Sequence, residues 1–126
     1  ALDRTAVAHA ASMAQMHKAR LQLLHIEEGV TSVVYGALAE TQEVESGQEC
    51  MDGILEALQG QAIEAEALVR HSNKPSEEIV SVAREWKADL VVMGAHGHKG
   101  LSDMVFGTTI NAVRHGLSVP LLIVRD

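Results

Sequence analysis

The sequence predicts an α/β domain in which helices and parallel strands alternate along the chain. Short apolar runs typical of buried strands stand at residues 20–26, 89–94 and 119–124. Residues 62–70 alternate apolar and polar positions, as a strand near the edge of a sheet does. Because segments with helical periodicity separate these strands, we expect a parallel sheet with right-handed crossovers and helices on both faces.

Four helices are expected, each with apolar residues at helical spacing. Pro75 opens one of them, since its fixed backbone angle suits the first helical turn. Gly60 and Gly116 follow the ends of two others, where glycine commonly stops a helix. The helices are expected up to residue 18, over residues 45–59, over residues 75–86 and over residues 108–115.

The composition indicates one domain with an aliphatic core. A chain of 126 residues is long enough for a single core, so one domain over residues 1–126 is expected. Hydrophobic residues make up 47% of the chain and aromatic residues only 2%, so Ala, Val, Leu, Ile and Met must fill the core. The 10 basic and 17 acidic residues give a net charge of −7, which argues against broad contact with nucleic acid or anionic membrane.

Cysteine usage and hydropathy indicate the compartment. Cys50 is the only cysteine, which excludes an internal disulfide and fits a reducing environment. No apolar run approaches the length of a membrane span, and no signal peptide is visible. We therefore expect a cytoplasmic protein.

A glycine-rich loop carries the clearest chemistry. A short apolar strand ends at Gly94, the loop contains Gly97, and Gly107 and Thr108 open an amphipathic segment. A helix N-terminus presents unpaired backbone N–H groups and a partial positive charge, and glycine lets an anion approach the backbone closely. Thr108 is able to cap the helix and to donate its hydroxyl to a phosphate oxygen. Strand, loop and helix start together predict a phosphate-binding site.

The spacing of the glycines distinguishes this loop from two commoner motifs. No Gly-Lys-Ser/Thr follows four variable residues, as a P-loop requires, and the glycines do not follow the dinucleotide fingerprint. The pattern is Gly94-x2-Gly97-x9-Gly107-Thr108, which resembles the nucleotide-binding signature of the universal stress protein family, G-x2-G-x9-G-[S/T]. The flanking residues are similar to the family as well: Val92-Met93-Gly94 before the loop, His96-Gly97 within it and Gly100-Leu101 after it.

The resemblance covers nearly the whole chain and implies both a fold and a ligand. The fold is an open five-stranded parallel sheet, adenine nucleotide alpha-hydrolase-like, with strand order 3-2-1-4-5. The ligand is ATP or another adenine nucleotide. Mg²⁺ would be held mainly by the phosphates, and Asp103 is a candidate to assist it.

The family's binding residues transfer to this chain one at a time. The alternative is that these glycines only shape a turn in a protein that has lost nucleotide binding. The residues that match are Asp3 and Ile26 at the adenine end, Gly94 and Gly97 against the ribose and phosphates, and Gly107, Thr108 and the weaker neighbour Thr109 at the helix start.

Two segments depart from the family pattern. Ala1 and Leu2 resemble the last residues of the family's first strand, so most of that central strand is missing from this sequence. A sheet without it would leave backbone groups on both neighbours unpaired, and we infer that the natural protein continues upstream or that the sequence is trimmed. Residues 27–47 form a long connection without clear periodicity, which is unusual in a compact domain.

The histidines and carboxylates do not predict a metal site or a catalytic centre. His96 and His98 would need a third metal ligand, and no Cys or carboxylate stands at suitable spacing. His25 lies inside an apolar strand and is expected at a hydrogen-bonded core position. No general base with an orienting partner is evident, so the sequence favours holding ATP over hydrolysing it, and no catalytic residue is predicted.

The last strand raises the question of a partner. In the family order, Pro120–Val124 lies at a sheet edge, where a bare apolar strand is an aggregation hazard. Either a loop or helix covers this edge, or two subunits pair there as family members commonly do. We expect a homodimer.

Three functional hypotheses follow. The first is an ATP-binding module for regulation or stress adaptation. The second is a slow ATP hydrolase or nucleotidyl-transferring enzyme whose turnover depends on Asp3, Thr108 or His96. The third is a nucleotide-independent interaction domain, such as one that is attached to a membrane transporter or regulates one.

Overall fold

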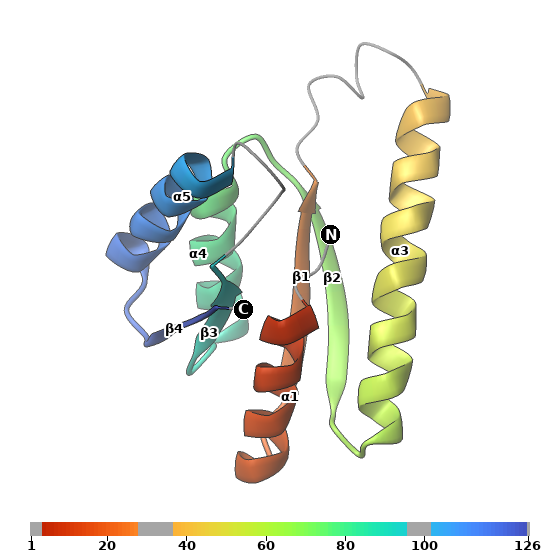
Figure 1. The fold of residues 1–126 in the computed structure, drawn as a ribbon, viewed down its shortest axis with the longest axis vertical. Helices are drawn as coiled ribbons and strands as arrows, with labels where there is room; N and C mark the ends of the chain where they lie inside the picture. Colours follow the sequence, from red (N-terminus) through yellow and green to blue (C-terminus); the bar gives the residue numbers. More distant parts are fainter. Residues whose placement is uncertain (1–3, 28–36, 96–101, 126) are drawn as a thin grey trace. The chain divides into compact units, whose positions relative to one another are not determined.

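The structure is a computed structural model with alternating helices and strands (Figure 1). It describes residues 4–27, 37–95 and 102–125, and it describes the side chains of all of these except residues 37–48 and 102–107. The predicted α/β architecture is confirmed. In chain order the elements are α1 (Arg4–His17), β1 (Leu21–Glu27), α3 (Ala37–Gly60), β2 (Ala65–His71), α4 (Pro75–Trp86), β3 (Val91–Gly94), α5 (Ser102–Gly116) and β4 (Leu121–Val124).

The described strands form two parallel pairs. β1 pairs with β2, with Leu21 opposite Ala65 and Glu27 opposite His71. β3 pairs with β4, with Val91 opposite Leu121. These pairs correspond to the 3-2 and 4-5 portions of the expected order, whereas a single five-stranded sheet is not confirmed. Ala1 and Leu2, expected to end the central strand, lie outside the described residues.

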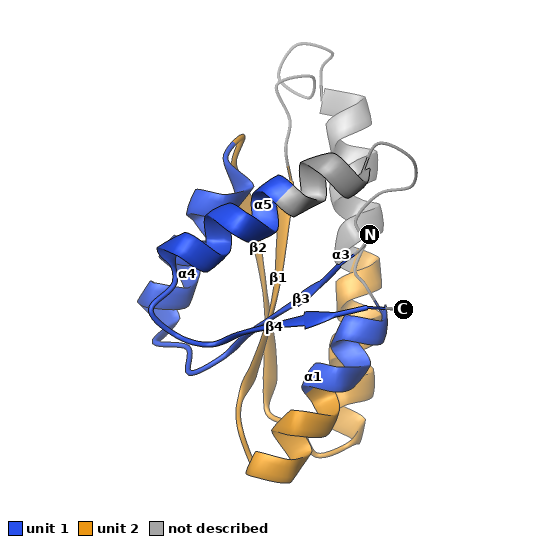
Figure 2. Ribbon diagram, turned by 60° about the vertical axis from the view of Figure 1, so that its left-hand side comes forward, with its two compact units in different colours: residues 1–10, 74–126 blue, residues 11–73 orange. Residues whose placement is uncertain are grey.

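The chain divides into two compact units, coloured separately in Figure 2. Unit 1 comprises residues 1–10 and 74–126 and contains the β3–β4 pair with α4 and α5. Unit 2 comprises residues 11–73 and contains the β1–β2 pair with α3. The expectation of one domain over residues 1–126 stays a prediction.

Two helices begin earlier than the sequence indicated. α3 begins at Ala37, so the expected irregular connection was wrong for residues 37–47. Those residues include Ala, Leu, Glu and Gln, all good helix formers. The apolar stripe that predicted the helix begins only later in the segment. α5 begins at Ser102 instead of Thr108. Gly107 does not interrupt it, since one glycine inside a helix costs only about 1 kcal/mol relative to alanine.

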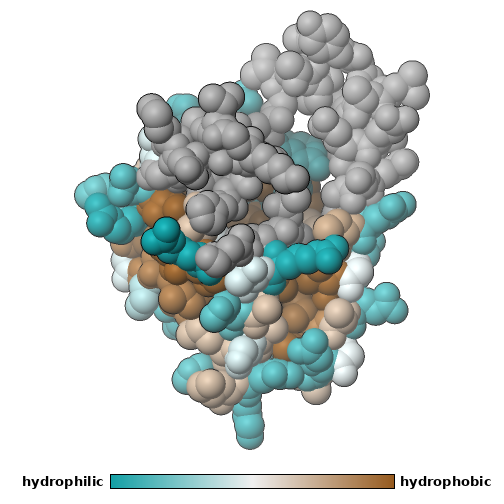
Figure 3. Space-filling model, in the orientation of Figure 1, coloured by the Kyte–Doolittle hydropathy of each residue, from teal (hydrophilic) through white to brown (hydrophobic). Residues whose placement is uncertain are grey.

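The cores of both units consist of small and aliphatic side chains, as the composition predicted. Among the described side chains, none that is polar or charged is fully buried. Apolar residues also remain visible on the face shown in Figure 3, in brown. The buried hydrophobic side chains of unit 2 are Ala11, Ala14, Leu23, Met51, Leu58 and Ile63, and those of unit 1 are Ala6, Val82, Val113 and Val124.

In unit 1, α4 packs against α5 through a glycine contact. A Cβ atom added at Gly116 would lie 2.9 Å from Cγ2 of Val80, closer than real Cβ contacts come. Val80 is β-branched and stiff, so it does not rotate away easily. Gly116 therefore permits the close approach of the two helices.

Gly116→Ala should lower the free energy of unfolding by about 1–3 kcal/mol, because the added methyl group overpacks the contact with Val80. Urea denaturation measures this change. The double variant Gly116→Ala/Val80→Ala should recover part of the loss.

Gly53→Ala is the matched control, since nothing lies within 4 Å of a Cβ at this α3 glycine. It should stabilise the protein by up to about 1 kcal/mol through helix propensity. Equal effects of the two alanine substitutions would contradict the packing role of Gly116.

Candidate functional site

The hydrogen bonds of β1 show which way each of its residues faces. Leu21 N–H donates to the Glu64 carbonyl (2.9 Å), and Ser72 N–H donates to the Glu27 carbonyl (3.1 Å). In a parallel pair, alternate residues of a strand bond to the same neighbour. The residues that bond to β2 are therefore Leu21, Leu23, His25 and Glu27, and those whose backbone groups face the opposite edge are Gln22, Leu24 and Ile26.

The backbone of Ile26 consequently offers one hydrogen-bond donor and one acceptor at the carboxyl end of β1. Its N–H and C=O point away from β2, and its side chain is half-buried. Ligands of open α/β sheets bind outside the carboxyl ends of the strands. The structure thus gives Ile26 a backbone arrangement suited to the role that the sequence predicted for it.

Gly94 occupies the corresponding position in unit 1. It is the last residue of β3 and is buried. Val91 N–H donates to the Pro120 carbonyl (3.0 Å) and Ala95 N–H to the Val124 carbonyl (2.8 Å). By the same alternation, Gly94 directs its backbone groups away from β4.

Helix α5, which carries Gly107 and Thr108, begins earlier than the sequence predicted. α5 begins at Ser102, so its unpaired N–H groups belong to its first turn, and Gly107 and Thr108 lie inside the helix. The expectation that Gly107 and Thr108 form the helix start was therefore wrong. The side chain of Thr108 is exposed, whereas Thr109 is half-buried. Ligand contacts by Gly107, Thr108 and Thr109 stay predictions.

The remaining predicted residues are distributed unevenly. Asp3 and Gly97 lie outside the described residues, as do His96 and His98. Unit 1 contains Gly94, Gly107, Thr108 and Thr109, whereas Ile26 belongs to unit 2. The structure therefore places four of the seven candidates in one unit and groups Ile26 with none of the others.

Two histidines contact one carboxylate beside Ile26, an arrangement that the sequence analysis missed. His25 Nε2 lies 3.7 Å from Glu27 Oε1, and His71 Nδ1 lies 3.5 Å from Glu27 Oε2. His25 is half-buried and not in the core. The available signal was the His-x-Glu spacing, which puts both side chains on the same face of a strand. The third member required the strand register, which places His71 opposite Glu27.

Two further features are absent from the described part of the chain. No group of three or more His, Cys, Asp or Glu side chains there is arranged to hold a metal ion. Across the same residues, no helix combines the length and apolar character needed to span a membrane.

The sequence matches the profile of the universal stress protein family over residues 2–125. The chain belongs to the universal stress protein family. Among curated members, universal stress protein A homolog 2 of Coxiella burnetii is 31% identical to it, over 98% of this chain and 86% of that protein. The family-level prediction from the glycine spacing is confirmed.

Solved universal stress protein structures share the fold. UspA of Lactobacillus plantarum superposes with a TM-score of 0.79 at 21% identity, over 97% of this chain and 88% of that one. The Archaeoglobus fulgidus protein in complex with dAMP gives 0.68 at 17% identity, over 94% and 84%. A universal stress protein in complex with cAMP gives 0.65 at 20% identity, over 94% and 83%. At these identities the likeness shows the α/β fold alone.

Proline substitutions test the direction of the hydrogen bonds in β1. Ile26→Pro should keep the pairing with β2, because proline removes only an N–H that faces the other edge. His25→Pro removes a donor to β2 and should cost about 1–3 kcal/mol more of the free energy of unfolding. Urea denaturation followed by circular dichroism compares the two variants.

Ile26→Ala and His25→Ala serve as side-chain controls for this comparison. The loss in free energy of unfolding for each alanine variant is subtracted from the loss for the proline variant at the same position. If the two differences are equal, the alternation assigned to β1 is wrong.

Proposed function

We propose that this universal stress protein binds an adenine nucleotide, with ATP as the first candidate, and acts as a nucleotide-responsive regulatory module in the cytoplasm during stress adaptation. The observation that carries the proposal is the backbone of Ile26, which offers one donor and one acceptor at the carboxyl end of β1. Relatives that share this fold form complexes with dAMP and cAMP, which supports the same ligand class for this chain.

The chemistry of adenine fits this backbone edge. The base has an acceptor at N1 next to a donor at N6. Ile26 N–H is able to donate to N1, while Ile26 C=O accepts from N6–H. The half-buried isoleucine side chain adds apolar surface against which a purine ring can pack. An adenine nucleotide therefore satisfies the two backbone groups that β2 leaves unused.

The phosphate contacts are proposed from the glycine signature in the sequence. Gly94, buried at the end of β3, leads into the loop whose spacing matches the family signature. Glycine at Gly107 would let a phosphate approach the first half of α5, and a threonine hydroxyl at Thr108 is a suitable donor. Because the chain is acidic overall, Mg²⁺ bound to the phosphates would reduce their repulsion from it.

Titration calorimetry with ATP, with and without Mg²⁺, tests the proposal. We expect a dissociation constant on the order of micromolar, equivalent to about 8 kcal/mol of binding free energy. Ile26→Pro should weaken binding about tenfold, because it removes the hydrogen bond to N1. Gly107→Val should abolish binding by obstructing the phosphates.

Gly53→Val is the control for the second substitution, since it places the same side chain on a helical glycine with open surroundings. It should bind ATP like the wild type. A folded wild-type protein without affinity for ATP or AMP would overturn the proposal and favour an interaction domain. Release of phosphate at a rate that Thr108→Ala lowers would instead favour a hydrolase.

We also infer that the protein is a homodimer through the edge of β4. Val124 C=O accepts from Ala95 N–H, so alternate residues of β4 bond to β3. Leu121 and Ile123 lie between those positions and direct their backbone groups to the other edge. An apolar strand with an open edge is suited to pairing with a second copy.

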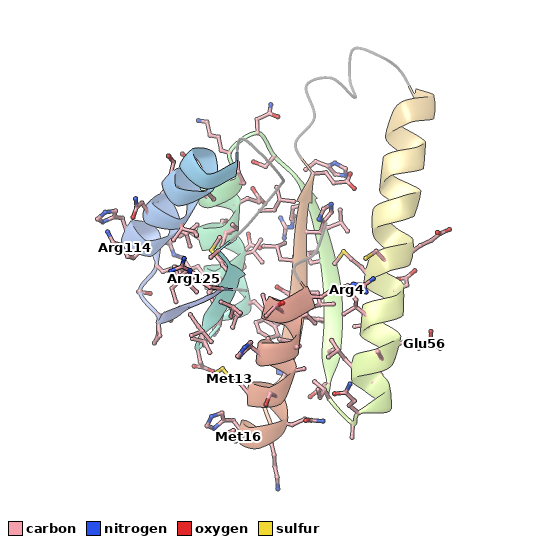
Figure 4. The ribbon with its side chains drawn as sticks, in the orientation of Figure 1. Arg4, Met13, Met16, Glu56, Arg114 and Arg125 are labelled. Carbon is pink, nitrogen blue, oxygen red and sulfur yellow. The ribbon has the colours of Figure 1, made fainter. Side chains whose placement is uncertain are left out.

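Ile123→Pro should convert the dimer to a monomer in sedimentation equilibrium, because it removes an edge donor without touching the pairing with β3. Met16→Lys is the control. Met16, labelled at the end of α1 in Figure 4, is 73% exposed and is the alternative apolar contact point. A dimer that Met16→Lys dissociates and Ile123→Pro does not would contradict this assignment.

A further inference from the structure

We propose that Glu27, held between His25 and His71, is a positioning residue that sets the selectivity of the Ile26 edge for adenine. This inference rests on the proposed nucleotide function. We refer to His25, Glu27 and His71 as the carboxylate clasp.

The clasp joins the ends of two strands through one side chain. Each oxygen of Glu27 faces a different imidazole, with His25 Nε2 at 3.7 Å and His71 Nδ1 at 3.5 Å. The Glu27 side chain is only 16% exposed, whereas that of His71 is 62% exposed. The carboxylate is therefore the inner member of the cluster, with one imidazole near each of its oxygens.

The same residues bracket the proposed base contact. His25 and Glu27 precede and follow Ile26, and their side chains lie on the opposite face of β1 from the isoleucine. Directly across the register from Glu27 is His71, and the next residue, Ser72, donates its N–H to the Glu27 carbonyl at 3.1 Å. The backbone after Ile26 is thus held twice, by the ladder and by the clasp.

A fixed backbone at Ile26 would align its N–H and C=O with a base. Hydrogen bonds weaken steeply when the donor and acceptor are misaligned, so two parallel bonds to a base require a fixed peptide orientation. β1 has a described neighbour on one side only, and strand ends open more easily than strand centres. A contact with an exposed imidazole such as that of His71 adds little to global stability. We therefore assign the clasp to positioning and not to holding the fold together.

Hypoxanthine provides the test of selectivity, because it has a donor at N1 and an acceptor at O6, the reverse of adenine. A base with this order must turn over to meet Ile26, which redirects its ribose. The fixed edge should therefore bind AMP more tightly than IMP. Calorimetry on the full chain gives both dissociation constants for the wild type, Glu27→Ala and Glu27→Gln.

Glu27→Ala should weaken AMP binding about tenfold, with less than about a twofold change for IMP, as expected for the loss of one well-aligned hydrogen bond. Glu27→Gln should retain the selectivity, since an amide of the same shape can occupy the same place between the two imidazoles and offers them both a donor and an acceptor. Glu66→Ala is the matched control. It removes the contact from Gln22 Nε2 to Glu66 Oε1 (3.0 Å), which links the same two strands near their other end.

The proposal is overturned if Glu27→Ala weakens AMP and IMP equally, or if Glu66→Ala changes selectivity as much. A wild-type protein that binds neither nucleotide would contradict the proposed function itself. Hydrogen exchange then still tests the clasp. Glu27→Ala should speed exchange of the Ser72 N–H but not of the Leu21 N–H, and unchanged protection of Ser72 would refute the positioning role.

Discussion

A strand in a parallel sheet bonds to each of its neighbours through alternate residues, and β1 uses one set of these residues for β2. The other set, which ends in Ile26, is left with its donors and acceptors facing the opposite edge. This constraint needs no special side chain. It follows from the register, which in turn follows from the burial of Leu23 and its apolar neighbours. The proposed base contact is therefore a consequence of how the core packs.

The carboxyl ends of the two strand pairs differ in the side chains that they carry. In unit 2, the carboxyl end of the strand pair carries charged and titratable side chains around a half-buried isoleucine. In unit 1, the corresponding strand end is a buried glycine, Gly94. A planar base suits the first environment, because it needs a shaped edge. Glycine at such a position puts no side chain between the backbone and a neighbouring group.

Much of this arrangement could be predicted from the sequence. Three apolar runs and the alternating segment over residues 62–70 located the four described strands, and the glycine spacing indicated the family. The helix starts could not be placed in this way. α3 begins in residues that favour helix without a continuous apolar stripe, and α5 begins before Gly107, which the glycine spacing had indicated as the opening of the helix. The carboxylate clasp was missed for another reason. Glu27 and His71 are 44 positions apart in the sequence, and only strand register brings them together.

The excess of acidic residues in the chain is visible on helix α3. The described part of α3 contains Glu49, Asp52 and Glu56 as exposed acidic residues and has no basic residue. Glu56 is labelled on this helix in Figure 4. At helical spacing these three side chains form one stripe, which water and salt solvate readily. This face is thus unsuited to anionic ligands.

The core of unit 1 holds an alanine, three valines and a glycine contact between two helices. Removing a methyl group from such a core leaves only a small cavity, so truncation is comparatively cheap. Adding a methyl group forces two backbones apart, because little flexible side chain lies between them. Mutational tolerance in unit 1 is therefore directional: its buried positions accept smaller side chains more easily than larger ones.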